Sequence, residues 1–328
     1  MKKFLALALS LVMTAALVGC GNSDSTPPAS SGSTAESTGD AINVAVVLKT
    51  LSSEYWNYVK AGCDAAAKDL GVNVTVVGPG AESDIEPQVG LIEQQIGAGC
   101  DAIVVAPNDA GAAANALKAA VDAGIPVLAV DTDVAMEGET CFVGTSNEDA
   151  AAVGGAYAAE LRGKDAKAVI IYGQEGDNTS NMRRAGYKRA MDEAGIEVLA
   201  ELSGQNTTDG ATKTMEDLLT SYPGQIDIVL CHNDDTATGA MNACKSAGVE
   251  GVTIIGFDGN KSAVDLILAG DLEGTVAQQP YEMGYQVVEA AVKAAKGETV
   301  DKVIYAEAKM VTKENGQEYL DGLAAMLA

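Results

Sequence analysis

The chain has 328 residues and a formal net charge of −25, which arises from 46 acidic and 21 basic side chains. This excess of negative charge argues against a protein that binds nucleic acid or an anionic membrane surface through bulk electrostatics. The roughly 290 residues that follow the N-terminal region are enough for two domains with separate hydrophobic cores.

Residues 1–19 have the pattern of a secretory signal. Two lysines precede an apolar run, residues 4–18, that is short for a membrane span. The run ends in Leu17-Val18-Gly19-Cys20, which resembles the lipobox of bacterial lipoproteins. That resemblance implies that Cys20 is lipidated and becomes the first residue after cleavage. The alternative is a plain signal peptide that ends near a cysteine.

Residues 21–40 consist mostly of Ser, Thr, Gly and Pro without apolar periodicity, a composition that buries too little surface to order itself. We interpret residues 20–40 as a lipidated cysteine followed by a flexible tether with a reach of roughly 25 Å. The folded part is expected to begin at residue 41.

Strands and helices alternate over the first part of the folded chain. Apolar β-branched runs predict strands, and apolar residues at helical spacing predict helices. The expected elements are a strand at 42–48, a helix at 58–70, a strand at 72–77 and a helix at 85–98. This βαβα order is typical of a parallel, doubly wound sheet.

A second series with the same order follows an irregular stretch after Asp131. A short run at 141–147 leads into a helix of small residues that extends to Leu161. The next expected elements are a strand at 168–172, a helix at 182–194, a strand at 197–202 and a helix at 210–221. Two such series predict an α/β protein with two doubly wound, Rossmann-like parallel sheets.

One pattern occurs twice, at residues 101–131 and 227–258. Each copy is predicted to form a strand, a polar Asn-Asp loop, an Ala-rich helix and a second strand that ends in Asp. Ligands of such sheets bind outside the carboxyl ends of the strands. The side chains expected there are those of Asn108, Asp131, Asn233 and Asp258. We interpret the two copies as facing halves of one site. The alternative is that the similarity has no functional meaning, because any doubly wound fold produces a repeat as loose as this one.

Aromatic residues make up only 4% of the chain, so their positions are informative. The only tryptophan, Trp56, follows Tyr55 just after the first strand, at the edge where ligands bind in this architecture. A flat ring packs well on the C–H face of a sugar, while amides and carboxylates bind its hydroxyls. The alternative is that the rings are hydrophobic anchors of the first helix. Both interpretations hold if one ring points outward to the ligand and the other points inward to the core.

The cysteines that remain after Cys20 are odd in number and lie within strand and helix patterns. They are Cys63, Cys100, Cys141, Cys231 and Cys244. No C-x-x-C motif occurs. We interpret them as small apolar core residues, with one disulfide in an oxidising compartment as the alternative.

The sequence lacks common signatures of an enzyme of this fold class. No G-x-S-x-G or G-x-x-x-x-G-K-[ST] motif occurs, and residues 49–54, after the first strand, contain no glycine. His232 is the only histidine, so a histidine-based triad or metal site would need it. We therefore expect no enzyme activity, no catalytic residue, no cofactor and no metal site.

Six stretches carry a family resemblance. In chain order they are VAVVLKTLSSEYWNYVKAG, PVLAVDTD, RRAGY, VLCHNDDTATGA, IIGFDG and GTVAQQP. From Ile42 to about Lys313 the chain resembles the ribose- and galactose-type sugar-binding proteins of bacterial ABC importers, the periplasmic binding protein type 1 family. The resemblance implies two doubly wound domains joined by three hinge segments, with the ligand in the cleft between them.

The resemblance also implies which residues contact the sugar. Tyr55 and Trp56 are expected to pack against the ring, beside Ser53. Asp131 is expected to accept hydrogen bonds from sugar hydroxyls, and Arg183 to donate a forked pair of hydrogen bonds. The polar shell is completed by Asn233, Asp258 and Gln278.

Two positions differ from the pattern of ribose binders. Those proteins usually have an Arg after the position of Asp131 and an aromatic residue near that of Asn206, whereas this chain has Thr132 and Asn206. We count Thr132 and Asn206 as candidate ligand contacts. The difference points away from ribose itself and toward a larger or differently oriented sugar, or a polyol.

Each candidate also has a purely structural alternative. Asp131 or Asp258 would cap the loop beyond its strand by accepting backbone N–H bonds. Arg183 would pair with a surface carboxylate, Asn233 would hold a turn, and Gln278 would serve only the crossover between domains.

The resemblance sets the expected domain boundaries. Residues 1–19 form the signal peptide and 20–40 the lipidated cysteine and tether. The N-terminal domain comprises residues 41–146 and 279–306, and the C-terminal domain comprises residues 147–278 and 307–328.

These features predict an extracytoplasmic, lipid-anchored monomer that captures a monosaccharide by cleft closure and delivers it to the permease and ATPase subunits of an ABC transporter. The alternative is a lipoprotein that senses a sugar or signal and feeds a membrane receptor or sensor kinase. Neighbouring genes for a permease and ATPase, or for a sensor kinase, would separate the two. Transcription regulators share this fold, but the secretory signal and the lack of a helix-turn-helix argue against one.

Overall fold

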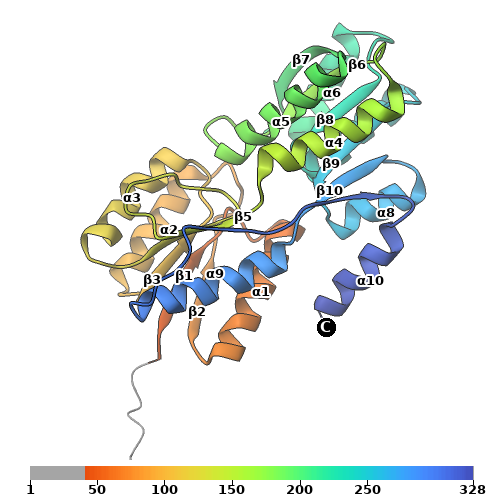
Figure 1. Ribbon diagram of the computed structural model, residues 1–328. Helices are drawn as coiled ribbons and strands as arrows, with labels where there is room; N and C mark the ends of the chain where they lie inside the picture. The colour runs from red at the N-terminus through yellow and green to blue at the C-terminus, as the bar shows by residue number, and fades with distance from the viewer. Residues whose placement is uncertain (1–40, 328) are drawn as a thin grey trace, which may run out of the picture. The chain divides into compact units, whose positions relative to one another are not determined.

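The computed structural model describes residues 41–327, which form twelve strands and ten helices arranged around two six-stranded sheets (Figure 1). The predicted signal peptide, Cys20 and tether lie outside the described residues. Within residues 41–327, none of the helices has both the length and the apolar character needed to cross a bilayer.

The first sheet is parallel throughout. Its strands, in spatial order, are β11 (Val303–Tyr305), β5 (Cys141–Gly144), β4 (Val127–Val130), β3 (Ala102–Val105), β1 (Asn43–Val47) and β2 (Asn73–Val77). Alternate residues of β1 face opposite sides: Val44 and Val46 belong to one hydrophobic cluster, and Ala45 and Val47 to another. Both faces of the sheet are therefore covered, as a parallel sheet requires.

The helices of the first sheet form two layers. On the side of Val44 and Val46 lie α1 (Glu54–Leu70) and α9 (Pro280–Ala295), which run beside each other in Figure 1 although they are far apart in sequence. On the side of Ala45 and Val47 lie α2 (Ile85–Gly97) and α3 (Ala110–Asp122). Buried aliphatic side chains fill both layers.

The second sheet repeats this plan. Its strands, in spatial order, are β12 (Lys309–Thr312), β10 (Gly274–Ala277), β9 (Thr253–Asp258), β8 (Ile228–Cys231), β6 (Lys167–Tyr172) and β7 (Glu197–Ser203). One face packs on α4 (Asn147–Arg162) and α5 (Asn178–Ala194), and the other on α6 (Thr208–Ser221), α7 (Asp234–Ala247) and α8 (Lys261–Ala269). The last helix, α10 (Gly316–Met326), packs against α8 and β12.

The predicted architecture of two doubly wound sheets is confirmed, with one difference in strand direction. The chain passes from one sheet to the other three times, between β5 and α4, between β10 and α9, and between β11 and β12. After the last passage, β12 pairs with β10 in antiparallel orientation. The helix between β10 and β12 in the chain, α9, packs on the first sheet, so no helical crossover of the second sheet connects these two strands.

Two helices begin four residues earlier than their apolar spacing predicts. The helix expected from residue 58 begins at Glu54, so Tyr55 and Trp56 belong to its first turn. The helix expected from residue 182 begins at Asn178, because Asp177 caps it and accepts hydrogen bonds from the backbone N–H groups of Thr179 and Ser180. The first turns of both helices consist of polar or aromatic residues, so the apolar spacing begins about one turn after the start of the helix.

The five cysteines between residues 41 and 327 are all free thiols. Four are buried, and Cys100 is partly exposed. The interpretation of these residues as core side chains agrees with this arrangement, and the alternative of a disulfide does not.

Glu139 gives the loop between β4 and β5 a predicted pH dependence. Burial, together with the neighbouring Asp133, raises the pKa of Glu139 from 4.5 to about 8. Because the folded state holds this proton more tightly than the unfolded chain, the associated stability is fully present below about pH 4.5 and is lost as the pH rises through about 8.

We therefore expect Glu139→Gln to become increasingly more stable than the wild type as the pH rises. Thermal unfolding at pH 5, 7 and 9 measures this difference in melting temperature. Glu137→Gln, at an exposed position of the same loop, controls for the loss of one formal charge. The prediction would be contradicted if the difference in melting temperature between Glu139→Gln and the wild type were the same at all three pH values.

Candidate functional site

A polar pocket lies where loops of the two sheets meet. It is lined by Lys49, Ser53, Tyr55, Trp56, Glu82, Asp131, Thr179, Arg183, His232, Asn233 and Asp258. The strands β1, β2, β4, β6, β8 and β9 all end beside these residues, so the pocket lies at the carboxyl ends of both sheets.

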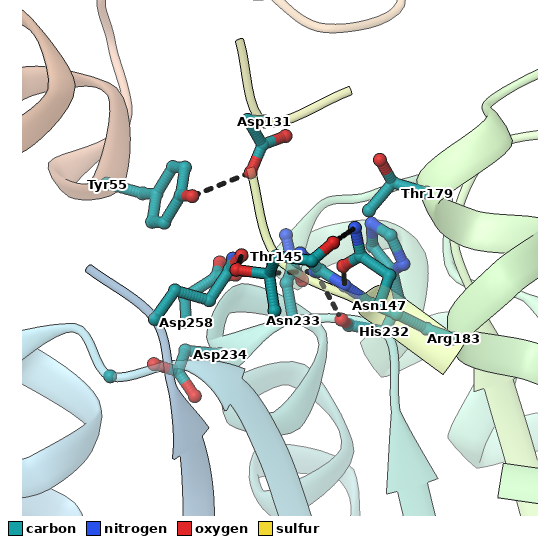
Figure 2. Close-up of polar contacts among 12 residues, drawn as sticks. Tyr55, Asp131, Thr145, Asn147, Thr179, Arg183, His232, Asn233, Asp234 and Asp258 are labelled. Carbon is teal, nitrogen blue, oxygen red and sulfur yellow. Dashed lines mark hydrogen bonds and ion pairs between the residues drawn. The ribbon is translucent and has the colours of Figure 1, made fainter. Parts of the chain in front are cut away.

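Tyr55 and Trp56 form an aromatic wall at the start of α1. Their rings meet edge to face, with centroids 5.1 Å apart and an interplanar angle of 88°. The Tyr55 hydroxyl donates to Asp131 Oδ2 at 2.6 Å (Figure 2), and Trp56 Nε1 donates to Glu82 Oε1 at 2.7 Å. Both rings line the pocket and also belong to the hydrophobic cluster beneath α1, so the interpretation as hydrophobic anchors holds for both, and their packing on a sugar stays a prediction.

Asp131 and Asp258 come from different sheets and share an unusual backbone conformation. Asp131, after β4, has φ 64°, and Asp258, at the end of β9, has φ 117°. Positive φ is costly for a residue with a side chain, and such strain is concentrated at functional sites. The Asp131 carboxylate accepts hydrogen bonds from the side chains of Tyr55 and Thr132. The Asp258 carboxylate accepts hydrogen bonds from the side chains of Arg183 and Gln278. These side-chain partners argue against the alternative that either residue is a loop cap.

Arg183 is buried at the centre of the site, with 3% of its surface exposed. Its Nε donates to Asn147 Oδ1 at 2.9 Å, and its Nη1 donates to the His232 carbonyl at 2.9 Å and to Asp258 Oδ1 at 3.3 Å (Figure 2). The guanidinium lies 3.7 Å from the centre of the Phe257 ring. The alternative of a surface ion pair for Arg183 is therefore wrong.

Burial dominates the ionisation of the carboxylate that Arg183 contacts. It raises the pKa of Asp258 well above 3.8, against the opposing attraction of Arg183. Nearby Asp234 and Asp131 raise the pKa further, because like charges disfavour ionisation. Burial thus favours the neutral form of Asp258, whereas hydrogen bonds from a ligand to its carboxylate would favour the charged form.

Asn233 has a structural role in addition to lining the pocket. It caps α7 through a reciprocal pair of bonds: its Oδ1 accepts from the Thr236 backbone N–H, and the Thr236 hydroxyl accepts from the Asn233 backbone N–H. The side-chain oxygen of Asn233 therefore has the kind of structural role that the alternative proposed, although it caps a helix instead of holding a turn. The amide nitrogen makes no bond to another described residue and is available to a ligand.

Three predicted site residues do not line the pocket and instead support residues that do. Thr132 bonds to Asp131 and to Thr179, each at 2.8 Å. Asn206 donates to Glu82 Oε2 at 2.7 Å, and its Oδ1 accepts from the backbone N–H of Gln174. Each of these side chains holds a lining residue in place rather than facing the empty space.

Gln278 is the third of these supporting residues. Its Nε2 donates to Asp258 Oδ1 at 2.9 Å, and its Oε1 accepts from the Thr145 hydroxyl at 2.8 Å. Thr145 and Gln278 lie on two of the passages between the sheets. Gln278 therefore connects the carboxylate of Asp258 to the crossover segments.

Lys49 and Asp177 form a buried ion pair between loops of the two sheets that the sequence did not reveal. Lys49 Nζ lies 2.6 Å from Asp177 Oδ2, and both side chains are at most 3% exposed. Burial lowers the pKa of Lys49, but attraction to Asp177, Glu82 and Asp131 outweighs it and raises the pKa overall. For Asp177, the attraction of Lys49 likewise overcomes burial and lowers the pKa. Both groups are therefore charged near neutral pH.

Glu82, Thr179 and His232 are further lining residues that were not predicted as ligand contacts. Burial, with a contribution from Arg183, lowers the pKa of His232 well below 6.5, so its imidazole is uncharged near neutral pH. Lys49 lies two residues after β1 and His232 directly follows β8, so the rule that ligands bind beyond strand ends identifies their positions. Glu82 lies farther along its loop and Thr179 lies in the first turn of α5, where that rule gives no signal.

The pocket surrounds two aromatic rings with carboxylates, amides and cations. Such groups bind hydroxyls through charge-assisted and amide hydrogen bonds, and the rings offer faces for C–H groups. This chemistry suits a small polyhydroxylated molecule.

Residues 44–299 match a family model described as the periplasmic binding protein domain. The ribose import binding protein of Bacillus subtilis is 32% identical over 287 residues, covering 88% of this chain and 91% of that protein. The xylitol-binding protein of Mycolicibacterium smegmatis is 30% identical over 306 residues, covering 88% of this chain and 85% of that protein.

Solved structures of binding proteins share the fold. A periplasmic solute binding protein of an ABC transporter from Actinobacillus succinogenes, with bound D-allose, superposes with a TM-score of 0.79 and is 29% identical, covering 85% of this chain and all of that chain (100%). A solute binding protein from Bacillus halodurans, with bound myo-inositol, has a TM-score of 0.78 and 28% identity, covering 86% of this chain and 99% of that chain.

Proposed function

Because the chain belongs to the periplasmic binding protein domain family, we propose that it captures a monosaccharide or a related polyol outside the cytoplasm and delivers it to an ABC importer. The family resemblance deduced from six sequence stretches is thus confirmed. The observation that carries the proposal is the single pocket in which Asp131 of the first sheet and Asp258 of the second both lie beside Tyr55 and Trp56. The relatives are named as binding proteins, and we propose binding without catalysis for this chain.

The proposed mechanism is capture by closure of the two halves on the ligand. Loops of both sheets touch around the pocket through the Lys49–Asp177 ion pair, the bond from Asn206 to Glu82, and the Thr132–Thr179 contact. A ligand that bonds to both halves stabilises this closed arrangement relative to an open one. Bending at the three passages between the sheets would admit and release the ligand.

The remaining features of the predicted protein belong to this proposal. We propose a first domain of residues 41–146 and 279–306 and a second of residues 147–278 and 307–328, acting as a monomer. Anchoring through a lipidated Cys20 would keep the protein at the outer face of the cell membrane, within reach of the permease and ATPase subunits.

The ligand is expected to differ from ribose. Thr132 and Asn206, which replace the arginine and aromatic residue usual in ribose binders, both bond to other site residues instead of lining the pocket. The relatives bind ligands of several shapes, as D-allose, myo-inositol and xylitol in their names show. A hexose, an inositol or an open-chain polyol fits the proposal equally well.

A thermal-shift panel tests the proposal. The protein is melted alone and with pentoses, hexoses, inositols, acyclic polyols and amino acids, after denaturation and refolding to remove any retained ligand. A ligand that binds only the folded state stabilises it by about 2.7 kcal/mol at a hundredfold excess over Kd. We expect at least one polyhydroxylated compound to raise the melting temperature. A shift given by an amino acid alone would overturn the sugar assignment.

A further inference from the structure

The pocket contains more negative than positive charge. Its lining has two cations, Lys49 and Arg183, against three carboxylates, Glu82, Asp131 and Asp258, and a fourth carboxylate, Asp177, is bonded to Lys49. His232 contributes no charge near neutral pH because burial lowers its pKa. Even if Asp258 holds a proton, the three other carboxylates outnumber the two cations.

Both cations already have partners. Lys49 is bonded to Asp177 at 2.6 Å. Arg183 is bonded to Asp258, to Asn147 Oδ1 and to the His232 carbonyl. Neither cation bonds directly to Glu82 or Asp131, so these two carboxylates lack a cationic hydrogen-bond partner within the described residues.

Glu82 and Asp131 instead accept hydrogen bonds from neutral groups. The donors are Trp56 Nε1 and Asn206 Nδ2 for Glu82, and the hydroxyls of Tyr55 and Thr132 for Asp131. Burial raises the pKa of Glu82, although attraction to Lys49 opposes this shift. Buried charges in proteins are usually paired, so a site of this kind favours a positive group from outside.

Asp235, in the first turn of α7, is also affected by this negative charge. Burial, followed by the repulsion of Glu82 and Glu54, raises the pKa of Asp235 to about 6. Of these three carboxylates, Glu82 lines the pocket. Walls of one sign focus the field and attract ligands of opposite charge.

An unsatisfied buried atom points independently to a ligand. His232, which lines the pocket, is only 4% exposed, and its Nδ1 is buried without a hydrogen-bond partner among the described residues. Buried polar atoms of folded proteins nearly always have a partner. A neutral imidazole with its proton on Nε2 offers Nδ1 as an acceptor, which suits a donor such as an ammonium or a hydroxyl.

We propose that the ligand carries a positive charge and is an amino sugar or an amino polyol, with an ammonium group in place of one hydroxyl. The ammonium binds between Glu82 and Asp131, next to the Tyr55 and Trp56 rings, and the hydroxyls bind the remaining carboxylate, amide and imidazole groups. This inference rests on the proposed function, because it specifies the ligand of the same pocket.

Calorimetric titration at pH 7 with matched pairs of ligands tests the inference. Each pair consists of a neutral compound and its amine, such as glucose and glucosamine, galactose and galactosamine, or myo-inositol and an aminocyclitol. Hydrogen bonds to charged groups are stronger than neutral ones, so at least one amine is expected to bind about tenfold or more tightly than its neutral partner. In Glu82→Gln the ratio of the amine's affinity to that of its neutral partner should fall toward one. Glu93→Gln, at an exposed position of α2, should retain the wild-type ratio.

The outcomes separate this inference from the proposed function. If neutral compounds bind as tightly as their amines in every pair, the inference is overturned and the proposed function stands. If an amine is preferred but Glu82→Gln keeps the full ratio, the placement of the ammonium is overturned. If no compound of either kind binds, the proposed function fails and the inference fails with it.

Discussion

Gly62→Ala will destabilise the protein by about 3 kcal/mol or more, because a methyl group does not fit where α1 crosses α9. A Cβ atom on Gly62 would overlap the carbonyl oxygen of Tyr281, and one on Gly284 would overlap that of Val59. Backbone atoms cannot rotate away as a side chain does. The two helices would have to separate, and the hydrophobic cluster beneath them would lose its packing.

Gly90→Ala is the matched control, because Gly90 is also a helical glycine but a Cβ atom added there would meet nothing within 4 Å. Replacement of glycine by alanine in an open helical position should stabilise the protein by about 0.5–1 kcal/mol. Denaturant unfolding of both variants measures the contrast. Equal stability of Gly62→Ala and Gly90→Ala would show that the α1–α9 contact is not as close as described.

Arg183→Met is expected to lower ligand affinity at least about a hundredfold and to reduce stability by about 3 kcal/mol. Methionine keeps the packing on Phe257 but removes the donors that Asn147, the His232 carbonyl and Asp258 now share. The buried carboxylate of Asp258 would then lose its only cationic hydrogen-bond partner within the described residues. Titration of the compound found in the panel and a denaturant melt measure the two effects.

Arg189→Met controls for the loss of an arginine. Arg189 is 38% exposed and pairs with Glu148 and Asp149 on the surface, where ion pairs contribute little to stability. We expect this variant to bind normally and to melt close to the wild type. If Arg183→Met binds the ligand with unchanged affinity, Arg183 does not contact the ligand, even if the variant is less stable.

The strands and the positions of the central site residues could be predicted from the sequence because both follow simple rules. Apolar β-branched runs identify strands such as β1 and β9, and ligands bind beyond the carboxyl ends of parallel strands. That rule identified Asp131, Asn233 and Asp258, which all line the pocket. It also pointed to Asn108, which does not line the pocket and instead donates to the Lys49 carbonyl. It could not tell that Thr132, next to Asp131, turns toward Thr179 instead.

Residues that reach the pocket from loops or helix starts were harder to predict. Asp177 was missed because its helix was expected to begin several residues later, after a polar first turn that has no apolar period. Glu82 lies in the loop before α2, and its position depends on Trp56 and Asn206, which are distant in sequence. The glycine contact between α1 and α9 likewise joins segments whose pairing no local pattern encodes.

The crystal structure of the complex with the compound that gives the largest thermal shift tests the central claim most directly. The account predicts one ligand in the pocket, beside Tyr55 and Trp56, with hydrogen bonds to Asp131 from the first sheet and to Arg183 or Asp258 from the second. A ligand bound elsewhere, or in contact with residues of only one sheet, would contradict it.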